Sequence, residues 1–192
     1  MTLNIAILYG SVRHHREGIK GARFVEQQCK SRGHYVSFLD PLEKPLPMLD
    51  KMHKEYEPGE APENIEECAR LIKNADAYIV VSGEYNHSIP PALKNMLDHF
   101  QQEYLFKPAG IATYSAGIFG GARASVHLRA ILGELGMATI SSMFPMMQVG
   151  QNFDENGNTS NEKLDKSFQK FIGELEWYGQ ALKNARKEGT PF

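Results

Sequence analysis

Short apolar runs alternate along this chain with segments of helical periodicity, and this alternation limits the possible folds more than any other feature. The apolar runs long enough for buried strands are Leu3–Leu8, Tyr35–Leu39, Ala77–Val81, Gly110–Tyr114 and Ala138–Ser142. Unbroken runs of this kind are typical of parallel strands that are covered on both faces. The order of elements therefore predicts an α/β fold with helices on both sides of a parallel sheet.

Apolar residues spaced three or four apart lie between and after these runs, and they predict the covering helices. The longest such stripe predicts a C-terminal helix over residues 161–186. Five strands joined by helices favour the flavodoxin-like order 2-1-3-4-5, which makes a three-layer sandwich of one domain, residues 1–192. Residues 41–62 contain five prolines, and we expect a long surface loop there.

Charge and composition exclude several classes of protein. The net charge of −2 gives no excess of the basic residues that bind nucleic acids or membrane surfaces. No apolar run approaches the roughly 20 residues that cross a bilayer, and the first residues lack the basic n-region of a signal peptide. Cys29 and Cys68 fall on helical apolar stripes and show no metal-binding or redox spacing. We therefore expect a cytoplasmic protein without a nucleic-acid, membrane or metal partner.

The segment after the first strand combines a hydroxyl group with two arginines. Ligands of a doubly wound sheet bind beyond the carboxyl ends of the strands, which is where this segment lies. It lacks the glycine-lysine-serine end of a Walker A loop and the spaced glycines of a dinucleotide fingerprint. Ser11, Arg13, Arg16 and the first N–H groups of the next helix would instead bind a terminal phosphate. A solvated basic loop is the alternative.

The segment after the third strand is a polar elbow that leads into a helix begun by Pro90 and Pro91. Its backbone N–H and C=O groups would bind the polar edge of a flat heterocycle. Glu84 and His87 allow a second interpretation, as an acid/base pair or as metal ligands. The metal interpretation is the weaker one because no third ligand lies nearby in the sequence. Ordinary turn chemistry is the third alternative.

The segment after the fourth strand holds Ser115 and three glycines, Gly117, Gly120 and Gly121. Glycine lets a backbone come close to a ligand and begin the next helix. Ser115 does not lie in a nucleophile elbow, so it carries no sign of nucleophilic catalysis. Such loops are common, and this one supports a ligand site only together with the other two.

Together these motifs resemble the NAD(P)H-dependent FMN reductase family, which includes azoreductases, quinone reductases and chromate-reducing proteins. The resemblance rests on Gly10-Ser11-Val12-Arg13, on Glu84-Tyr85-Asn86-His87-Ser88-Ile89-Pro90, and on the helix Leu93-Lys94-Asn95-Met96-Leu97-Asp98. It extends from the first strand to about Met137, and the elbow is its most specific part. The resemblance implies a flavodoxin-like fold and FMN as the cofactor, with NADPH or NADH as co-substrate.

By this resemblance, three groups of residues would surround FMN. The phosphate would lie among Ser11, Arg13, Arg16, Glu17, Gly18 and Ile19. The isoalloxazine ring would lie beside Glu84, Tyr85, Asn86 and His87, and Ser115, Gly117, Gly120 and Gly121 would close its other side. Hydride transfer to a flavin needs no protein nucleophile, so we expect no catalytic side chain.

The expected function is an oxidoreductase that takes hydride from NAD(P)H and reduces a second small molecule by a ping-pong mechanism. That acceptor would be a flavin, a quinone, an azo compound or a metal oxyanion. A flavodoxin-type electron carrier and an FMN-binding regulatory module are the alternatives, and the arginines of the first loop argue against the carrier. The apolar residues from Leu93 to Phe106 exceed what one face of a sheet needs, so we also expect a homodimer or homotetramer.

Overall fold

The computed structural model describes residues 2–192, and their central feature is a five-stranded parallel sheet. The strands are β1 (Asn4–Tyr9), β2 (Tyr35–Leu39), β3 (Ala77–Gly83), β4 (Pro108–Tyr114) and β5 (Ala138–Met146). They pair in the order β2-β1-β3-β4-β5, as the sequence predicts. Because every neighbouring pair is parallel, the carboxyl ends of the strands meet at one edge of the sheet.

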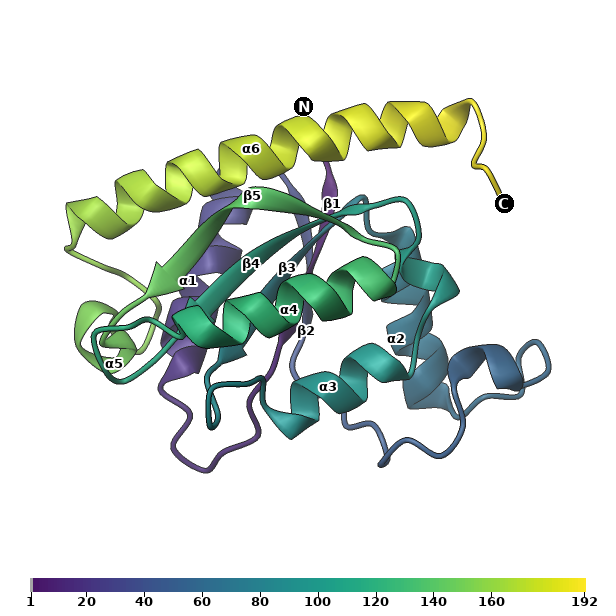
Figure 1. The fold of residues 1–192 in the computed structure, drawn as a ribbon, viewed down its shortest axis with the longest axis horizontal. Helices are drawn as coiled ribbons and strands as arrows, with labels where there is room; N and C mark the ends of the chain where they lie inside the picture. Colours follow the sequence, from purple (N-terminus) through teal and green to yellow (C-terminus); the bar gives the residue numbers. More distant parts are fainter. Residues whose placement is uncertain (1) are drawn as a thin grey trace.

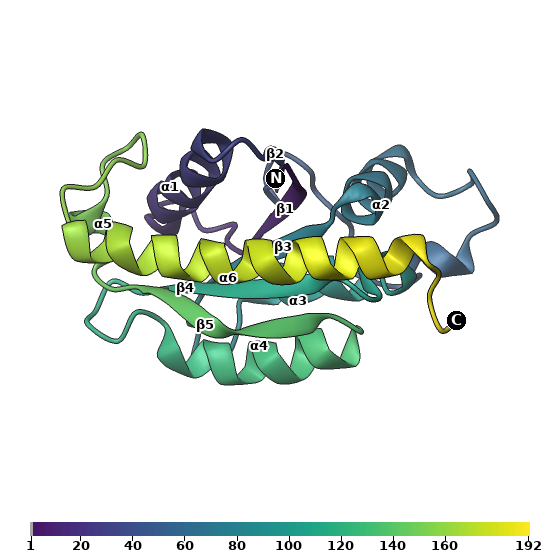
Figure 2. The same ribbon diagram turned by 90° about the horizontal axis from the view of Figure 1, so that it is seen from above.

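Helices cover both faces of this sheet and complete the expected three-layer sandwich. They are α1 (Gly18–Ser31), α2 (Glu63–Asn74), α3 (Pro91–Asp98), α4 (Ala122–Glu134), α5 (Val149–Asn152) and α6 (Glu162–Lys187). One buried apolar cluster joins the sheet to α1, α5 and α6, and a second joins it to α2, α3 and α4. Figure 1 shows α6 running along the length of the molecule, and Figure 2 shows α1 and α4 on opposite sides of the sheet.

Three strands are longer than the apolar runs that predict them, and one of these, β4, begins at Pro108 instead of Gly110. β3 continues to Gly83 because the polar Ser82 pairs with Thr113 of β4 inside the sheet. β5 continues to Met146, past the end predicted at Ser142. As the edge strand it alternates between buried and exposed residues, and a register shift interrupts its pairing with β4. An edge strand with a bulge has no unbroken apolar run, which is why the sequence pattern ends early.

The apolar residues of α3 and the chain after it lie inside the molecule, so the interface argument drawn from them is wrong. Leu93, Leu97, Phe100 and Tyr104 are fully buried between the sheet and the surrounding helices. The homodimer or homotetramer stays a prediction without that support.

The long loop 41–62 explains part of this burial. It contains one short 3₁₀ helix, η1 (His53–Glu55), and a second such helix, η2 (Gln102–Tyr104), follows α3. The loop is fixed beside α3, since Leu49 N donates to Asn95 Oδ1 at 2.9 Å and His53 N donates to His99 O at 2.8 Å. No helix formed by residues 2–192 is long and apolar enough to span a membrane.

Candidate functional site

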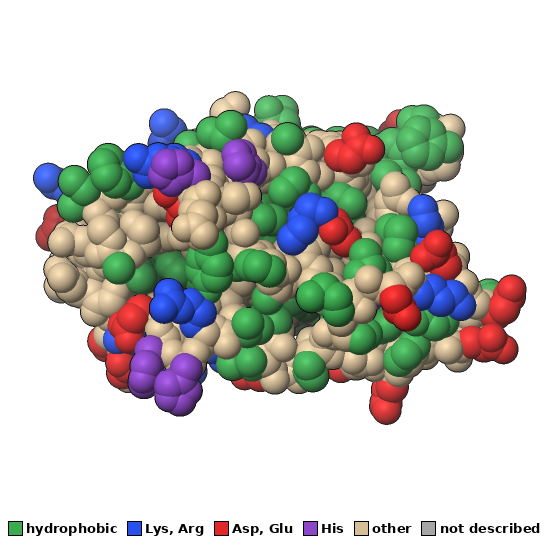
Figure 3. Space-filling view, turned by 60° about the horizontal axis from the view of Figure 1, so that its bottom comes forward, with side chains coloured by type: hydrophobic (Ala, Val, Ile, Leu, Met, Phe, Trp, Pro, Cys, Tyr) green, Lys and Arg blue, Asp and Glu red, His purple; other side chains and the backbone are tan. Residues whose placement is uncertain are grey.

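The three segments that the sequence selects follow β1, β3 and β4, which lie next to one another in the sheet. Their loops therefore converge at the carboxyl edge of the strands, where doubly wound sheets bind their ligands. Figure 3 shows the molecule with the lower side of Figure 1 turned forward, where hydrophobic side chains spread across the middle of the surface among charged groups and histidines. The topology thus brings together the residue groups that the sequence proposes for one site.

In the loop between β1 and α1, Ser11 and Arg13 are placed differently with respect to solvent. Ser11 is buried, and its hydroxyl group accepts a hydrogen bond from Arg13 N at 3.4 Å. The Arg13 side chain is exposed and forms no ion pair with any of residues 2–192. Arg13 lies in the loop that leads into α1, and both an unpaired guanidinium and a helix N-terminus favour binding of a dianion.

Arg16, in contrast, is bound within the protein. Its guanidinium pairs with Asp40, a buried carboxylate directly after β2, and donates to the Ser11 carbonyl oxygen at 3.2 Å. Burial alone would lower the pKa of Arg16, but the hydrogen bond and the charge of Asp40 raise it. The sequence interpretation grouped Arg16 with Arg13 as a phosphate ligand. The structure shows that Arg16 ties the loop to the end of β2, with Arg13 as the free cation.

Glu17, Gly18 and Ile19 form the start of α1. The Glu17 carboxylate pairs with Lys20 Nζ at 2.6 Å, so it faces a cation of its own helix. Ile19 is half-buried against the apolar cluster of this face. Gly18 lies against the ring of Tyr114, and a Cβ atom at Gly18 would overlap that ring. A glycine is therefore required here by close packing.

The elbow after β3 is a two-residue turn. Tyr85 N donates to Ser88 O and Ser88 N donates to Tyr85 O, both at 2.9 Å. Asn86 and His87 between them have φ angles of 49° and 69°, as in a type I′ hairpin turn. Their own N–H groups find no acceptor among residues 2–192, so these donors are free to meet a ligand.

Glu84 links the elbow to the glycine loop. Its carboxylate accepts hydrogen bonds from Arg123 N at 2.9 Å, Arg123 Nη1 at 3.2 Å and Ala124 N at 3.4 Å. Burial would raise the pKa of Glu84, but these hydrogen bonds at the start of α4 outweigh burial and lower it. A carboxylate held ionised by such donors is a poor proton donor. The absence of a catalytic side chain stays a prediction.

The glycine loop after β4 is fixed to the end of β5. Ser115 N donates to Met146 O at 3.2 Å, and Gln148 N donates to Gly117 O at 2.9 Å. The loop turns into α4 through Gly121, whose φ of 76° disfavours other residues. Ile118 and Phe119 at its tip are largely exposed. The loop is thus a fixed wall with an apolar tip opposite the elbow.

Sequence analysis missed three residues of this edge: Tyr9, Asp40 and Tyr114. Asp40 pairs with an arginine 24 positions earlier, and Tyr9 and Tyr114 stack with ring centroids 6.2 Å apart across the end of β3. The signals available were an acidic residue after β2 and a tyrosine at the end of two strands. Neither signal indicates a site until the strand order shows that these residues lie at the same edge of the sheet.

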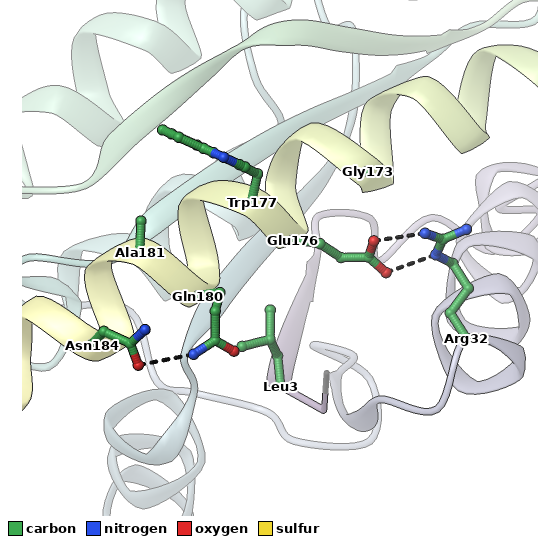
Figure 4. Close-up of a pocket in the computed structure, with 8 residues that line it drawn as sticks. All are labelled: Leu3, Arg32, Gly173, Glu176, Trp177, Gln180, Ala181 and Asn184. Atoms are coloured by element: carbon green, nitrogen blue, oxygen red, sulfur yellow. Dashed lines mark hydrogen bonds and ion pairs between the residues drawn. The ribbon is translucent and has the colours of Figure 1, made fainter.

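A cavity of about 720 Å³ lies away from this edge. It lies beside Leu3, at the start of β1, and runs along α6, where Figure 4 shows Trp177, Gln180 and the ion pair between Arg32 and Glu176. The start of a parallel strand is the opposite end from its carboxyl edge. We therefore place the functional site by the converging loops and not by cavity size.

Comparison with known proteins bears on these loops. The sequence profile described as NADPH-dependent FMN reductase matches residues 3–151, which include all three segments. The chain belongs to this family. It is accordingly an oxidoreductase of the FMN-dependent class that uses NAD(P)H, and the predicted family and cofactors are confirmed.

Relatives and solved structures agree with this assignment. A quinone reductase of Escherichia coli is 32% identical over 130 residues, which cover 65% of this chain and 68% of the relative. A 2-hydroxy-1,4-benzoquinone reductase of Burkholderia is 28% identical over 184 residues, covering 90% of this chain and 93% of the relative. The solved flavoenzyme NAD(P)H:(acceptor) oxidoreductase FerB of Paracoccus denitrificans superposes with a TM-score of 0.73 at 23% identity, covering 95% and 98% of the two chains. That likeness confirms the flavodoxin-like fold.

The residues at this edge fit FMN. Arg13 supplies an unpaired cation for a phosphate, and the turn of Asn86 and His87 supplies free N–H groups for the polar edge of a ring. Gly18 and Gly83 make room for the Tyr114 ring beneath this loop, since a Cβ atom at Gly83 would come within 3.1 Å of Tyr114. The individual contacts to FMN stay predictions.

Proposed function

We propose that this chain takes hydride from NADH or NADPH and reduces a second acceptor by a ping-pong mechanism, with FMN held at the carboxyl edge of the sheet. When bound, FMN supplies the chemistry by accepting a hydride from the nicotinamide and passing electrons to the acceptor. The observation that supports the proposal most is that an unpaired arginine and a turn with two N–H groups free of partners among residues 2–192 follow adjacent strands of the sheet.

The protein's own contribution is to bind, orient and exclude water. Arg13 and the start of α1 would hold the phosphate, which fixes the ring relative to the elbow. The N–H groups of Asn86 and His87 would face the ring edge where negative charge develops on reduction, and fixed donors in that position stabilise the charge. Hydride transfer needs two flat rings about 3–3.5 Å apart, so the walls of the site act by positioning.

The acceptor is proposed to be a flavin, quinone, azo compound or metal oxyanion. Relatives of this chain include a quinone reductase and an FMN-dependent NADPH-azoreductase. Quinones, azo dyes and free flavins are flat apolar or aromatic molecules. The exposed Ile118 and Phe119 offer an apolar wall for a molecule of that kind. A cytoplasmic location stays a prediction.

A steady-state assay separates the proposal from its alternatives. Purified protein is mixed with FMN and NADPH under air, and the absorbance of reduced nicotinamide is followed with and without a quinone. Steady oxidation of NADPH that depends on FMN supports the enzyme. Flavin binding without oxidation favours an electron carrier or a regulatory module, and no flavin binding contradicts the proposal.

A further inference from the structure

Hydroxyl groups gather beneath the phosphate loop, at the point where α1 begins. Tyr9 ends β1, Ser11 follows in the loop, and Tyr114 ends β4. Tyr9 is fully buried, Ser11 is 2% exposed and Tyr114 is 9% exposed. The rings of Tyr9 and Tyr114 stack with their centroids 6.2 Å apart. This cluster is therefore a polar layer within an otherwise apolar face of the sheet.

Two glycines allow this cluster to form. β3 lies between β1 and β4, and Gly83 at its end has no side chain to separate Tyr9 from Tyr114. A Cβ atom at Gly83 would lie 3.1 Å from the Tyr114 hydroxyl oxygen, and one at Gly18 would overlap the Tyr114 ring. The Tyr114 ring thus passes over the end of β3 and lies against the first residue of α1. Its Cζ atom, which carries the hydroxyl group, is the atom nearest to the Cβ position of Gly18 and so lies beside the helix start.

The hydrogen bonds of this cluster are incomplete. The buried Tyr9 hydroxyl has no partner of acceptable geometry among residues 2–192. A buried hydroxyl group without a hydrogen-bond acceptor lowers the stability of the fold by roughly 1–3 kcal/mol. Burial raises the pKa of Tyr9 well above its ordinary value, and burial likewise raises the pKa of Tyr114. Both phenols are therefore protonated donors at neutral pH, and what the cluster lacks is an oxygen that only accepts.

A phosphate dianion supplies that acceptor. Tyr9 has no exposed surface, so it could reach a ligand only through a neighbour, whereas Tyr114 keeps 9% of its surface exposed. We propose that the Tyr114 hydroxyl donates to the terminal phosphate of FMN, and that Tyr9 is a positioning residue that donates to the Tyr114 oxygen. This inference rests on the proposed function, and it assigns to the pair the discrimination of FMN from riboflavin.

The test measures the affinity of the apoprotein for FMN and for riboflavin by quenching of flavin fluorescence. Tyr114→Phe is expected to weaken FMN binding about tenfold and Tyr9→Phe about threefold, with riboflavin unchanged in both. The double variant should lose about tenfold, because Tyr9 acts through Tyr114. Tyr35→Phe, at an exposed tyrosine at the start of β2, is the matched control and should change neither affinity. Thermal unfolding of each variant shows that it is folded.

The outcomes separate this inference from the proposed function. A wild-type protein that binds FMN no better than riboflavin contradicts the phosphate site itself. A wild-type preference for FMN that Tyr114→Phe retains undiminished overturns the tyrosine assignment alone, since Arg13 accounts for a separate part of that preference. Equal losses for FMN and riboflavin also overturn it, because they show that the hydroxyls support the ring or the fold. Losses that multiply in the double variant contradict the positioning role of Tyr9.

Discussion

Arg13 and Arg16 lie three residues apart in one loop, yet their environments differ. Arg16 forms an ion pair with the buried Asp40, and Arg13 forms no ion pair with any of residues 2–192. Arg16→Met should destabilise the protein while Arg13→Ala should not. Methionine keeps an apolar stem where the Arg16 guanidinium lies 5.5 Å from the centre of the Tyr9 ring, but it removes the charge that pairs with Asp40. Asp40 is 1% exposed, and its Oδ1 would then keep only the N–H of Leu42, which donates at 2.9 Å.

The expected size follows from that burial. Leaving a buried carboxylate without its cation costs about 3 kcal/mol. For a chain of this length, about 3 kcal/mol lowers Tm by about 6–12 °C. Arg13 is exposed and unpaired, so Arg13→Ala should change the free energy of unfolding by less than about 0.5 kcal/mol. The same Arg13 variant should weaken FMN binding at least about tenfold and leave riboflavin binding unchanged.

Urea unfolding of the apoproteins, read by circular dichroism, measures these differences. The double variant Arg16→Met/Asp40→Asn removes both charges, so it should be more stable than Arg16→Met alone. A loss below about 1 kcal/mol for Arg16→Met refutes the reasoning, because the Asp40 carboxylate would then not depend on Arg16. A double variant no better than the single one refutes it as well.

Three further predictions concern the rest of this edge. Glu84→Gln should destabilise the protein by about 1–2 kcal/mol at neutral pH and lower kcat less than about a hundredfold. The folded state lowers the pKa of Glu84 from its ordinary 4.5, so the stability difference between wild type and Glu84→Gln should fade as the pH drops below 4.5. Gly18→Ala should destabilise by about 1–3 kcal/mol and weaken FMN binding, since its Cβ displaces Tyr114; calorimetry and flavin titration measure both. His87→Gly should raise the free energy of unfolding by about 1 kcal/mol, seen as a higher urea midpoint, because glycine adopts the left-handed backbone of this position without strain. A lowered midpoint contradicts this, and kcat should fall less than about a hundredfold.

The fold could be predicted because each strand and helix is indicated by a pattern within its own segment, and this pattern recurs along the chain. Unbroken apolar runs such as Ala77–Val81 indicate buried parallel strands, and their alternation with helical stripes leaves few strand orders. That order then places the segments after β1, β3 and β4 at one edge. The three loops of the site follow from the sequence for this reason.

What the sequence missed depends on contacts between distant residues. The apolar side of α3 suggested an interface because nothing local shows that the loop 41–62 is fixed beside it, through Leu49 and His53. Arg16 was grouped with Arg13 because its partner Asp40 follows another strand. Tyr9 and Tyr114 meet only because β3 lies between their strands and ends at Gly83. None of these contacts can be predicted from the composition of the chain or from the spacing of its residues.

The central claim is that this chain binds FMN at the carboxyl edge of its sheet and reduces it with NAD(P)H. The most direct test mixes the FMN-loaded protein with one equivalent of NADPH or NADH without oxygen and follows the visible absorbance of the flavin. The account predicts rapid bleaching, and full recovery of the absorbance when a quinone is then added. Arg13→Ala loaded to the same degree should bleach as well, since Arg13 acts on phosphate binding. Bound flavin that keeps its colour with both nucleotides would contradict the account.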